Sequence, residues 1–392
     1  MVNAVVMRQR AVAGAQTRPL PDPWLTGLAL TLLLLGVIMV GSASVATAGR
    51  DIGDPFYFLK HQALYGGVGL IAGFIVYEIP LAWWERSRFA LLVGAMALLA
   101  LVLVPGIGHT VNGSMRWIEL GPLGGQASEP ARLLIFIYVA GYLVHRREEI
   151  QSFTGFLKPM IVLAGAALLL LMEPDFGAAA VMMGTALTMM FLGGVRLRHF
   201  IVLVLIVAAA LALLAWSSPY RMDRLTAFLN PWADPFDDGF QLTQSLIAIG
   251  RGGWFGVGLG ESVQKLFYLP EAHTDFLYAV LAEELGVAGA VAVIAVYLGI
   301  TWRAFAIGRA AARRGHDFGA FIACGLGLWI GLEGFINIGV NMGVLPTKGL
   351  TLPLMSYGGS SLVVTVAAVA MILRVQREAE AVGRSASPRQ RK

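Results

Sequence analysis

Long apolar stretches separated by short polar ones run along most of the chain, and this alternation predicts membrane-spanning helices. A helix needs about twenty apolar residues to cross a bilayer. The apolar segments are 24–45, 62–79, 89–104, 129–145, 158–172, 177–194, 199–216, 275–301, 318–343 and 350–374. We therefore expect an all-α, polytopic membrane protein with ten transmembrane helices. The segment 129–145 is short for this purpose, since seventeen helical residues extend only about 25 Å.

The polar segments define the rest of the organisation. Residues 1–23 and 376–392 are predicted to be tails that flank a membrane domain at 24–375. The first apolar segment is long and is followed by others, which predicts a retained span and not a cleaved signal. A polar loop at 105–128 and a much longer one at 217–274, between helices 7 and 8, interrupt the pattern. Loops this long are usually functional. The second is rich in apolar residues, and 241–249 is predicted to form a re-entrant or interfacial helix.

Composition agrees with a membrane protein. The 392 residues are 57% hydrophobic and 14% charged, with a mean hydropathy of +0.72. Soluble domains contain roughly 25% charged residues. The single cysteine, Cys324, excludes an intrachain disulfide and a cysteine metal cluster.

Charge distribution predicts the orientation. If both termini are cytoplasmic, 20 of the 29 Lys and Arg residues fall on the cytoplasmic side and 9 on the outer side, as the positive-inside rule requires. This arrangement makes Glu-Pro-Asp-Phe-Gly at 173–177 an outer turn. The outer side then holds 13 acidic residues, so its few cations are candidates for binding an anionic ligand.

The stretch 269–285 is the leading candidate for a functional site. Pro270 suits the first turn of a helix, because its missing N–H would be unpaired there in any case. Glu271, His273 and Asp275 therefore gather where water meets the membrane. An ionisable group in this position is either functional or a helix cap, and the spacing alone leaves both interpretations open.

Helical spacing predicts how this stretch is arranged. One stripe would carry Asp275, Ala279, Ala282, Gly286 and Gly289. Small residues let a second helix approach closely, so Asp275 is expected to face into the bundle. Glu283 and Glu284 would lie about 12–13 Å deeper in the membrane. Carboxylates that flank one sugar bond need a separation of roughly 5–9.5 Å, so Asp275 would act as a lone base.

Four cations lie in the predicted outer loops among glycines and aromatic residues: Arg116, Arg251, Lys265 and Lys348. Arginine and lysine are the usual partners of phosphate, so these residues are candidates for binding a diphosphate. The alternative is that they anchor lipid headgroups or pair with outer acids.

Several other functions lack their motifs. There is no P-loop, no two-histidine zinc pattern and no Gly-x-Ser-x-Gly elbow, and the glycines at 256–260 follow no strand. We therefore expect neither a nucleotide cofactor nor nucleic-acid binding. Asn337 and Asn341, one helical turn apart, are predicted to bond between helices. The small residues at 356–361 indicate tight packing or a broken helix beside a cavity.

Five motifs, taken together, resemble the SEDS family (shape, elongation, division and sporulation). They are Val-Asn-Gly-Ser-Met-Arg-Trp-Ile at 111–118, Glu-Pro-Asp-Phe-Gly at 173–177, Val-Gln-Lys-Leu at 263–266 with Tyr-Leu-Pro-Glu-Ala-His-Thr-Asp-Phe at 268–276, Leu-Pro-Thr-Lys-Gly-Leu-Thr-Leu-Pro-Leu at 345–354, and Ser-Tyr-Gly-Gly-Ser-Ser at 356–361. The resemblance covers about 24–375, and Pro-Thr-Lys-Gly-Leu-Thr at 346–351 is similar to the division branch. At 126–132 the family usually has lysine where this chain has Arg132, although Glu129 is kept.

The resemblance implies a peptidoglycan glycosyltransferase of the bacterial inner membrane, acting on lipid II at the periplasmic side of the division septum. It implies a class B penicillin-binding transpeptidase (FtsI-type) as partner, with other divisome membrane proteins of the FtsQ, FtsL and FtsB types. The family's essential aspartate falls on Asp275. The motifs also supply candidate substrate-binding residues at Glu271, His273, Glu129 and Ser360.

Our mechanistic hypothesis is one inverting displacement, because an α-linked donor gives a β-linked product. Asp275 would be the general base, with Arg116, Lys348 and one of Lys265 or Arg251 stabilising the leaving diphosphate, and with a divalent cation (Mg²⁺ or Mn²⁺) as a further stabiliser. The alternatives are a lipid II flippase, which would need polar residues through the membrane, and a scaffold for the transpeptidase. Transport of lipid II without polymer would indicate the flippase, and neither activity would indicate the scaffold.

Overall fold

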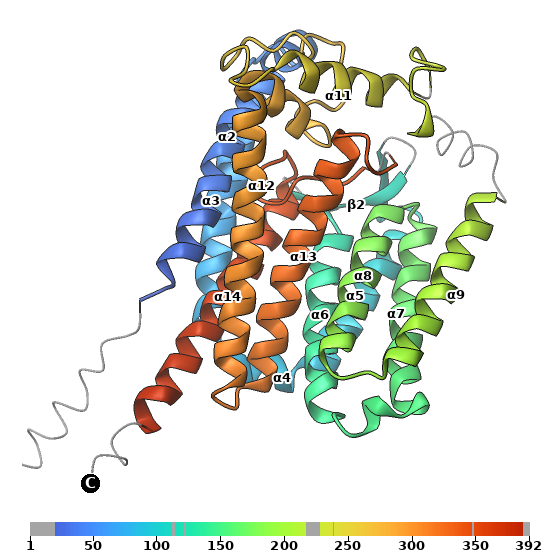
Figure 1. Cartoon of the computed structure of the whole chain (residues 1–392), viewed down its shortest axis with the longest axis vertical. Helices are drawn as coiled ribbons and strands as arrows, with labels where there is room; N and C mark the ends of the chain where they lie inside the picture. The colour runs from blue at the N-terminus through green and yellow to red at the C-terminus, as the bar shows by residue number, and fades with distance from the viewer. Residues whose placement is uncertain are drawn as a thin grey trace, which may run out of the picture.

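The structure is a computed structural model that describes residues 20–111, 114–120, 123–216, 228–237, 239–346 and 349–386. Long helices run side by side in a bundle (Figure 1). The elements are α2 (Pro23–Asp51), α3 (Tyr57–Glu78), α4 (Leu81–Arg86), α5 (Arg88–Val102), β1 (Gly108–Val111), β2 (Ser114–Leu120), β3 (Leu123–Gln126), α6 (Ser128–His145), η1 (Glu149–Gln151), α7 (Phe153–Met172), α8 (Phe176–Leu192), α9 (Leu197–Trp216), α11 (Phe240–Arg251), α12 (Leu277–Ala312), α13 (Asp317–Asn341) and α14 (Gly359–Ala386).

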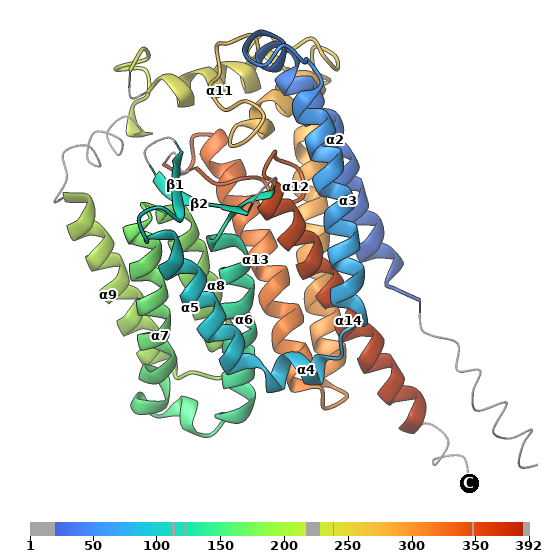
Figure 2. The ribbon, with the colours of Figure 1, turned by 180° about the vertical axis from the view of Figure 1, so that it is seen from behind.

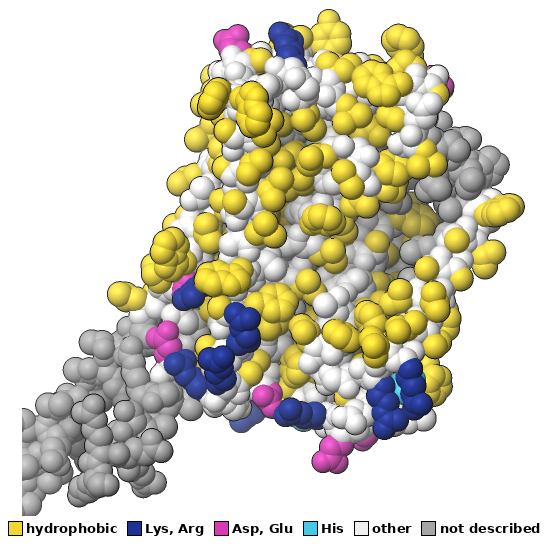
Figure 3. Space-filling model, in the orientation of Figure 1, with side chains coloured by type: hydrophobic (Ala, Val, Ile, Leu, Met, Phe, Trp, Pro, Cys, Tyr) yellow, Lys and Arg dark blue, Asp and Glu magenta, His cyan; other side chains and the backbone are white. Residues whose placement is uncertain are grey.

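Each predicted apolar segment overlaps one helix of the structure. Within the described ranges, six helices are long and apolar enough to cross a membrane, and three apolar helices are shorter. Hydrophobic side chains cover the middle of the face shown in Figure 3, and charged side chains gather mainly at its lower end. These features are those of a multi-pass membrane protein, as the sequence predicted.

The two ends of the bundle differ. The upper end, at the top of Figure 1, carries α11 and the strands, and the lower end carries α4. Figure 2 shows β1 and β2 above α5 and α6. The strands form one antiparallel sheet in the order β1-β2-β3, with Trp117 opposite Gln126. The all-α prediction did not include this sheet, because its strands are short and rich in glycine.

Two predictions about the connecting segments are confirmed. The predicted helix at 241–249 is part of α11. The predicted turn at 173–177 separates α7 from α8, and Asp175 caps α8 because its carboxylate accepts a hydrogen bond from the N–H of Ala178 at 3.0 Å.

The last helix begins and ends later than predicted. The start of the predicted segment 350–374 is not helical, and α14 begins at Gly359. A Cβ atom on Gly359 would lie 2.7 Å from the ring of Tyr65, which confirms tight packing at this motif. The helix then continues through part of the predicted C-terminal tail, where Arg377 pairs with Glu78 at 3.0 Å. The predicted N-terminal tail, up to residue 19, lies outside the described residues, as do residues 387–392.

Helix α12 is sharply bent at Gly286. This residue has φ +68° and ψ −170°, a backbone conformation that favours glycine. The hydroxyl of Tyr278 donates to the carbonyl of Ala290 at 3.3 Å. In a straight helix these residues would be about 18 Å apart along the axis, so the two parts of α12 fold back on one another.

Backbone groups exposed by the bend are satisfied by the loop that follows α11. The N–H groups of Val257 and Gly258 donate to the carbonyls of Glu283 and Glu284. The N–H groups of Val287 and Ala288 donate in turn to the carbonyls of Gly253 and Trp254. This exchange explains how a helix can break within a membrane domain without leaving unpaired backbone groups.

The bend overturns the predicted depth of Glu283 and Glu284. Glu284 accepts a hydrogen bond from Ser42 of α2 at 2.7 Å. Gly36, six residues earlier on α2, faces the backbone of Met355, whose loop contacts the residues next to Asp275. Ser42 is about 9 Å nearer the upper end than Gly36, so the two glutamates lie above Asp275 and not below it. The predicted small-residue stripe is likewise interrupted at Gly286.

Candidate active site

Asp275 lies two residues before α12, and its backbone is held by hydrogen bonds from α13. Its carbonyl accepts hydrogen bonds from the side-chain amides of Asn337 and Asn341 of α13, at 3.0 and 2.9 Å. Its half-buried carboxylate makes no hydrogen bond to any residue that the structure describes. A Cβ atom on Gly349 would lie 3.2 Å from Asp275 Oδ2, so the carboxylate rests against the loop before α14. A held but unpaired carboxylate is suited to accept a proton.

A tight turn presents this carboxylate. Glu271 has φ +54°, an uncommon conformation outside glycine, and its carbonyl accepts hydrogen bonds from the N–H groups of Thr274 and Phe276 at 3.1 and 3.2 Å. The exposed Glu271 carboxylate accepts a further bond from the Thr274 hydroxyl at 2.7 Å. The turn therefore fixes where α12 begins and where Asp275 points.

His273 supports the turn through its ring. The imidazole lies 4.3 Å from the ring of Phe58 and 5.7 Å from that of Tyr357, centroid to centroid. Its carbonyl accepts a hydrogen bond from the N–H of Tyr357 at 3.0 Å. Burial lowers the pKa of His273, so the ring is neutral at physiological pH.

Arg116 of β2 joins the sheet to the turn between α7 and α8. Its guanidinium donates to the carbonyls of Glu173 and Pro174 at 3.2 and 2.5 Å and lies 3.9 Å from the Asp175 carboxylate. The side chain is only partly exposed. Its positive charge acts on Asp275 as well.

Asp175 also organises the neighbouring strand. Its carboxylate accepts hydrogen bonds from the Gln126 amide at 3.0 Å and the Ser128 hydroxyl at 3.4 Å. Ser360, at the start of α14, accepts a bond from the N–H of Gln126 at 2.8 Å. The sheet, the α7–α8 turn and α14 are thereby tied together beside Arg116.

Electrostatics at this site favour protonated carboxyls. Burial raises the pKa of Asp275 to about 7; the negative charges of Glu271 and Asp175 add to the rise and Arg116 opposes it. Burial likewise raises the pKa of Glu173 to about 8. Neither carboxylate oxygen of Glu173 has a hydrogen-bond partner in the described part of the chain. Asp275 thus has a pKa matched to proton transfer near neutral pH.

Glu129 belongs to a buried ionic triad in the bundle. Arg132 lies 2.5 Å from Glu129 and 3.2 Å from Glu333, and its guanidinium is 5.2 Å from the ring centroid of Trp329. All three charged side chains are almost completely inaccessible to solvent. The arginine that replaces the family's usual lysine therefore bridges two carboxylates from different helices.

Two predicted cations lie near the bend in α12. The buried Lys265 ammonium contacts Ser42 at 3.0 Å and Glu284 at 2.8 Å. Arg251, which is more exposed, lies 3.6 Å from Glu283. Both partners are carboxylates. In the structure, Lys265 and Arg251 therefore pair with acidic residues, which was the alternative to phosphate binding.

The structure thus brings only some of the predicted residues together. Asp275, Arg116, Glu271 and His273 surround one region, with Ser360 and Glu129 on adjoining elements. Lys265 and Arg251 are at the bend. Lys348 lies outside the described residues, although its neighbour Gly349 contacts Asp275. Sequence reasoning missed Asp175 as the partner of Arg116 and the asparagine pair as the support of Asp275; the Glu-Pro-Asp turn was the only signal for the first.

A divalent cation would have few protein ligands here. Across the described ranges, no group of three His, Cys, Asp or Glu side chains is arranged to hold a metal ion. Mg²⁺ commonly binds through one or two carboxylates together with substrate phosphates. The predicted cation stays a prediction.

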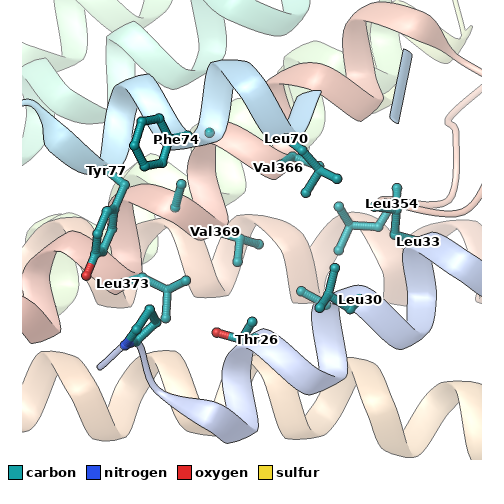
Figure 4. Close-up of a pocket in the computed structure, with 14 residues that line it drawn as sticks. Thr26, Leu30, Leu33, Leu70, Phe74, Tyr77, Leu354, Val366, Val369 and Leu373 are labelled. Atoms are coloured by element: carbon teal, nitrogen blue, oxygen red, sulfur yellow. The ribbon is translucent and has the colours of Figure 1, made fainter. Parts of the chain in front are cut away.

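An apolar cavity of about 340 Å³ lies away from these residues, between α2, α3 and α14 (Figure 4). Leu33, Phe74, Val369 and Leu373 line it, and none of the candidate site residues does. Leu354 closes one end, and the same loop contacts the residues preceding Asp275. The cavity is therefore separated from Asp275 by the loop before α14.

Fold and site together define a polytopic α-helical membrane protein whose upper end holds Asp275, a carboxyl group with a raised pKa. The chain belongs to the FtsW/RodA/SpoVE family, described as cell cycle proteins, whose sequence pattern matches residues 23–381. The resemblance to the SEDS family is thereby confirmed.

Relatives and solved structures agree with this membership. The chain is 62% identical to "Probable peptidoglycan glycosyltransferase FtsW" of Thioalkalivibrio sulfidiphilus over 91% of this chain and 90% of that one. It is 59% identical to the protein of the same name from Nitrosococcus halophilus, over 94% and 95%. Among solved structures, it is similar to a chain of a "peptidoglycan synthase complex" (TM-score 0.76, 30% identity, 92% and 98% covered). It is also similar to the rod shape determining protein RodA of Thermus thermophilus (TM-score 0.66, 28% identity, 91% and 97% covered).

Proposed function

We propose that this protein is a peptidoglycan glycosyltransferase that polymerises lipid II into β-1,4-linked glycan strands at the division septum. The relatives that bear this activity in their names support the reaction class. The observation that carries the proposal for the site is Asp275. Its carboxylate has no hydrogen-bond partner among the described side chains and backbone groups, has a pKa of about 7, and lies within the influence of Arg116.

The reaction follows from these groups. Asp275 removes the proton from the 4-hydroxyl of the acceptor GlcNAc as that oxygen forms a bond to the anomeric carbon of the donor sugar. The bond from this carbon to the diphosphate breaks on the opposite face, and undecaprenyl diphosphate leaves. Arg116 and Lys348 stabilise the charge on the leaving diphosphate. One base and one displacement give inversion, and no second carboxylate is needed to form a covalent intermediate.

The same proposal sets the orientation in the membrane. Ten crossings with both termini in the cytoplasm place the upper end, and with it Asp275, on the periplasmic side of the inner membrane. The distribution of Lys and Arg supports this arrangement.

A partner is part of the proposal. A solved chain similar to this one comes from work described as "Structural coordination of polymerization and crosslinking by a peptidoglycan synthase complex". This likeness supports a class B penicillin-binding transpeptidase as the partner here. Divisome proteins of the FtsQ, FtsL and FtsB types are further proposed partners.

The pairing of the acidic side chains that a flippase would use does not favour that alternative. Glu333 pairs with Arg132, Glu284 with Lys265, and Glu78 with Arg377. Carboxylates held in this way stabilise contacts between segments of the chain, and none of them is free to carry a polar headgroup across.

The test compares Asp275→Asn with Asp234→Asn, each purified with the transpeptidase and given lipid II in detergent. Asp234 is exposed in the loop before α11 and serves as the matched control. Loss of a general base costs about 10²- to 10⁴-fold in rate, so Asp275→Asn should make almost no glycan and Asp234→Asn should make normal strands. Normal strands from Asp275→Asn would exclude it as the base.

A further inference from the structure

The last turns of α13 carry two buried asparagines that face the Asp275 turn. Asn337 is 2% exposed and Asn341 is 0% exposed. They are one helical turn apart and therefore lie on the same side of α13. A buried side-chain amide is costly unless it is hydrogen-bonded, so the partners of these two groups indicate what they do.

Their hydrogen bonds converge on one segment. The Asn337 and Asn341 amide N–H groups both donate to the Asp275 carbonyl, at 3.0 and 2.9 Å. The Asn341 side-chain oxygen accepts a bond from the N–H of Ala279, in the first turn of α12, at 3.1 Å. Asn341 therefore spans the junction between the Asp275 turn and the helix that follows it.

The Asn337 side-chain oxygen accepts a bond from the Asn341 amide at 3.4 Å, and a further bond of Asn337 reaches a different part of the chain. Its amide donates to the carbonyl of Leu350 at 2.5 Å. Leu350 follows Gly349, which contacts the Asp275 carboxylate. A single amide group therefore joins the Asp275 turn to the loop before α14, at the point where the two segments touch.

The contact between these two segments involves no regular secondary structure. Asp275 precedes the helix, and Gly349 and Leu350 lie in an irregular stretch, so neither has a regular hydrogen-bond ladder at these residues. The Ser356 hydroxyl donates to the Thr274 carbonyl at 2.5 Å and supports the same contact one residue away. Removing the Asn337 amide would take this donor from the buried Leu350 carbonyl and leave the Asp275 carbonyl with the Asn341 amide, so the direct link between the two segments would be lost.

We propose that Asn337 and Asn341 are positioning residues for glycan polymerisation: they hold Asp275 at a fixed distance from the loop before α14, at Gly349 and Leu350. This inference rests on the proposed function. It assigns to α13 the task of holding the proposed base against the loop before α14, so that proton removal occurs from one arrangement of the site.

The alternative is that the asparagines only stabilise the fold, and kinetics separate the two. A positioning role predicts a loss in kcat with little change in KM for lipid II, because the substrate is still bound but the base is misplaced. A role in stability alone predicts that activity falls only in proportion to the amount of folded protein.

The test uses Asn337→Leu, which keeps the size of the side chain and removes the donor. Asn230→Leu is the matched control, since Asn230 is exposed before α11. With the transpeptidase bound and lipid II as substrate, we expect Asn337→Leu to lower kcat at least tenfold and to change KM less than threefold. The Tm of its complex should stay within a few degrees of that of the Asn230→Leu complex. A normal kcat in the folded variant would overturn the proposal.

Asn337→Ser and Asn341→Ser provide the second measurement if Asn337→Leu fails to fold. Each keeps one hydroxyl donor, so kcat should fall less than in the leucine variant while remaining below that of the control. Wild-type kcat in both serine variants would overturn the proposal. Asp275→Asn tells the two ideas apart, because an active Asp275→Asn enzyme refutes the proposed function, whereas an inactive one beside a normal Asn337→Leu refutes only this inference.

The pH profile adds a readout that stability does not change. The charged groups that act on Asp275 are Glu271 from its own turn, Asp175 from the α7–α8 turn and Arg116 from β2, and His273 is its neutral neighbour. If the turn loosens, Asp275 gains contact with water and its pKa moves towards its ordinary value. The acidic limb of the kcat profile should therefore move to lower pH in Asn337→Leu and stay in place in Asn230→Leu.

Discussion

The Asp275 site and the bend in α12 carry similar side chains, but their carboxylates differ in hydrogen bonding. Only eight residues separate Asp275 from Glu283, and each region combines carboxylates with a cation. At the bend, Glu283 accepts bonds from the Ser262 hydroxyl at 2.5 Å and from the N–H of Val263 at 3.2 Å. Glu284 is paired with Lys265. The Asp275 carboxylate has no such bond within the described residues.

This difference in hydrogen bonding distinguishes carboxylates that stabilise the fold from one that is suited to proton transfer. A buried carboxylate with several donors contributes to the fold through those hydrogen bonds. A carboxylate with a fixed backbone and no donor keeps a raised pKa and can take up a proton. The bonding of each group, and not its residue type or its place along the chain, indicates which role it has.

The largest expected effect tests whether Lys265 belongs to the bend. Lys265→Met would leave the buried Glu284 without its cation, which costs about 3–5 kcal/mol. We expect a large fall in Tm, partly restored by Lys265→Met with Glu284→Gln. Thermal unfolding of the purified complex measures this, with Lys60→Met as the control because Lys60 is exposed and pairs with Asp54 at the surface.

The opposite result for Lys265 would indicate that it belongs to the substrate site. An unchanged Tm together with a loss of polymerisation would mean that the contact with Glu284 is not needed for the fold. The original prediction that Lys265 stabilises the leaving diphosphate would then apply, and the two regions would form one functional unit.

A smaller effect concerns pH. Because the pKa of Asp275 is raised to about 7, the base is mostly protonated at pH 6 and mostly charged at pH 8, so the rate should rise with a midpoint near 7. The negative charge of Glu271 adds to this rise, so Glu271→Gln should lower the midpoint by less than one unit. Initial rates from pH 5.5 to 8.5 measure it. A midpoint that Glu271→Gln leaves unchanged would mean that its charge does not reach Asp275.

Sequence reasoning located the helices and the central aspartate for clear physical reasons. Hydropathy sets where a chain can cross a membrane, and every predicted apolar segment overlaps a helix, although α14 begins later than predicted. Asp275 stood out because a titratable group at the boundary of a span is costly unless it is used. These features depend on local composition, which one sequence contains in full.

What the sequence did not predict depends on contacts between distant segments. By its spacing, Gly286 fitted a stripe of small residues on a straight helix. The helix bends at Gly286 because the loop at 252–258 forms hydrogen bonds with the backbone on both sides of this residue. The charges of Lys265 and Arg251 suggested phosphate binding, but their partners are set by that same bend. The asparagines were expected to bond between helices, and their actual partners, the carbonyls of Asp275 and Leu350, lie outside regular helix.

The smallest expected effect probes the contact between Asp275 and the loop before α14. In Gly349→Ala the added methyl group would lie 3.2 Å from Asp275 Oδ2. The carboxylate oxygen must therefore shift by a few tenths of an ångström, which requires a rotation of the side chain. A strained rotamer costs about 0.5–1.5 kcal/mol, which corresponds to a two- to tenfold lower rate. Gly250→Ala in α11, where nothing lies within 4 Å of the new atom, is the control and should have a normal rate. If Gly349→Ala also polymerises lipid II at the normal rate, the carboxylate does not rest against this loop during turnover. Asp275 would then differ from the glutamates at the bend in having no close contact with the loop as well as no hydrogen bond within the described residues.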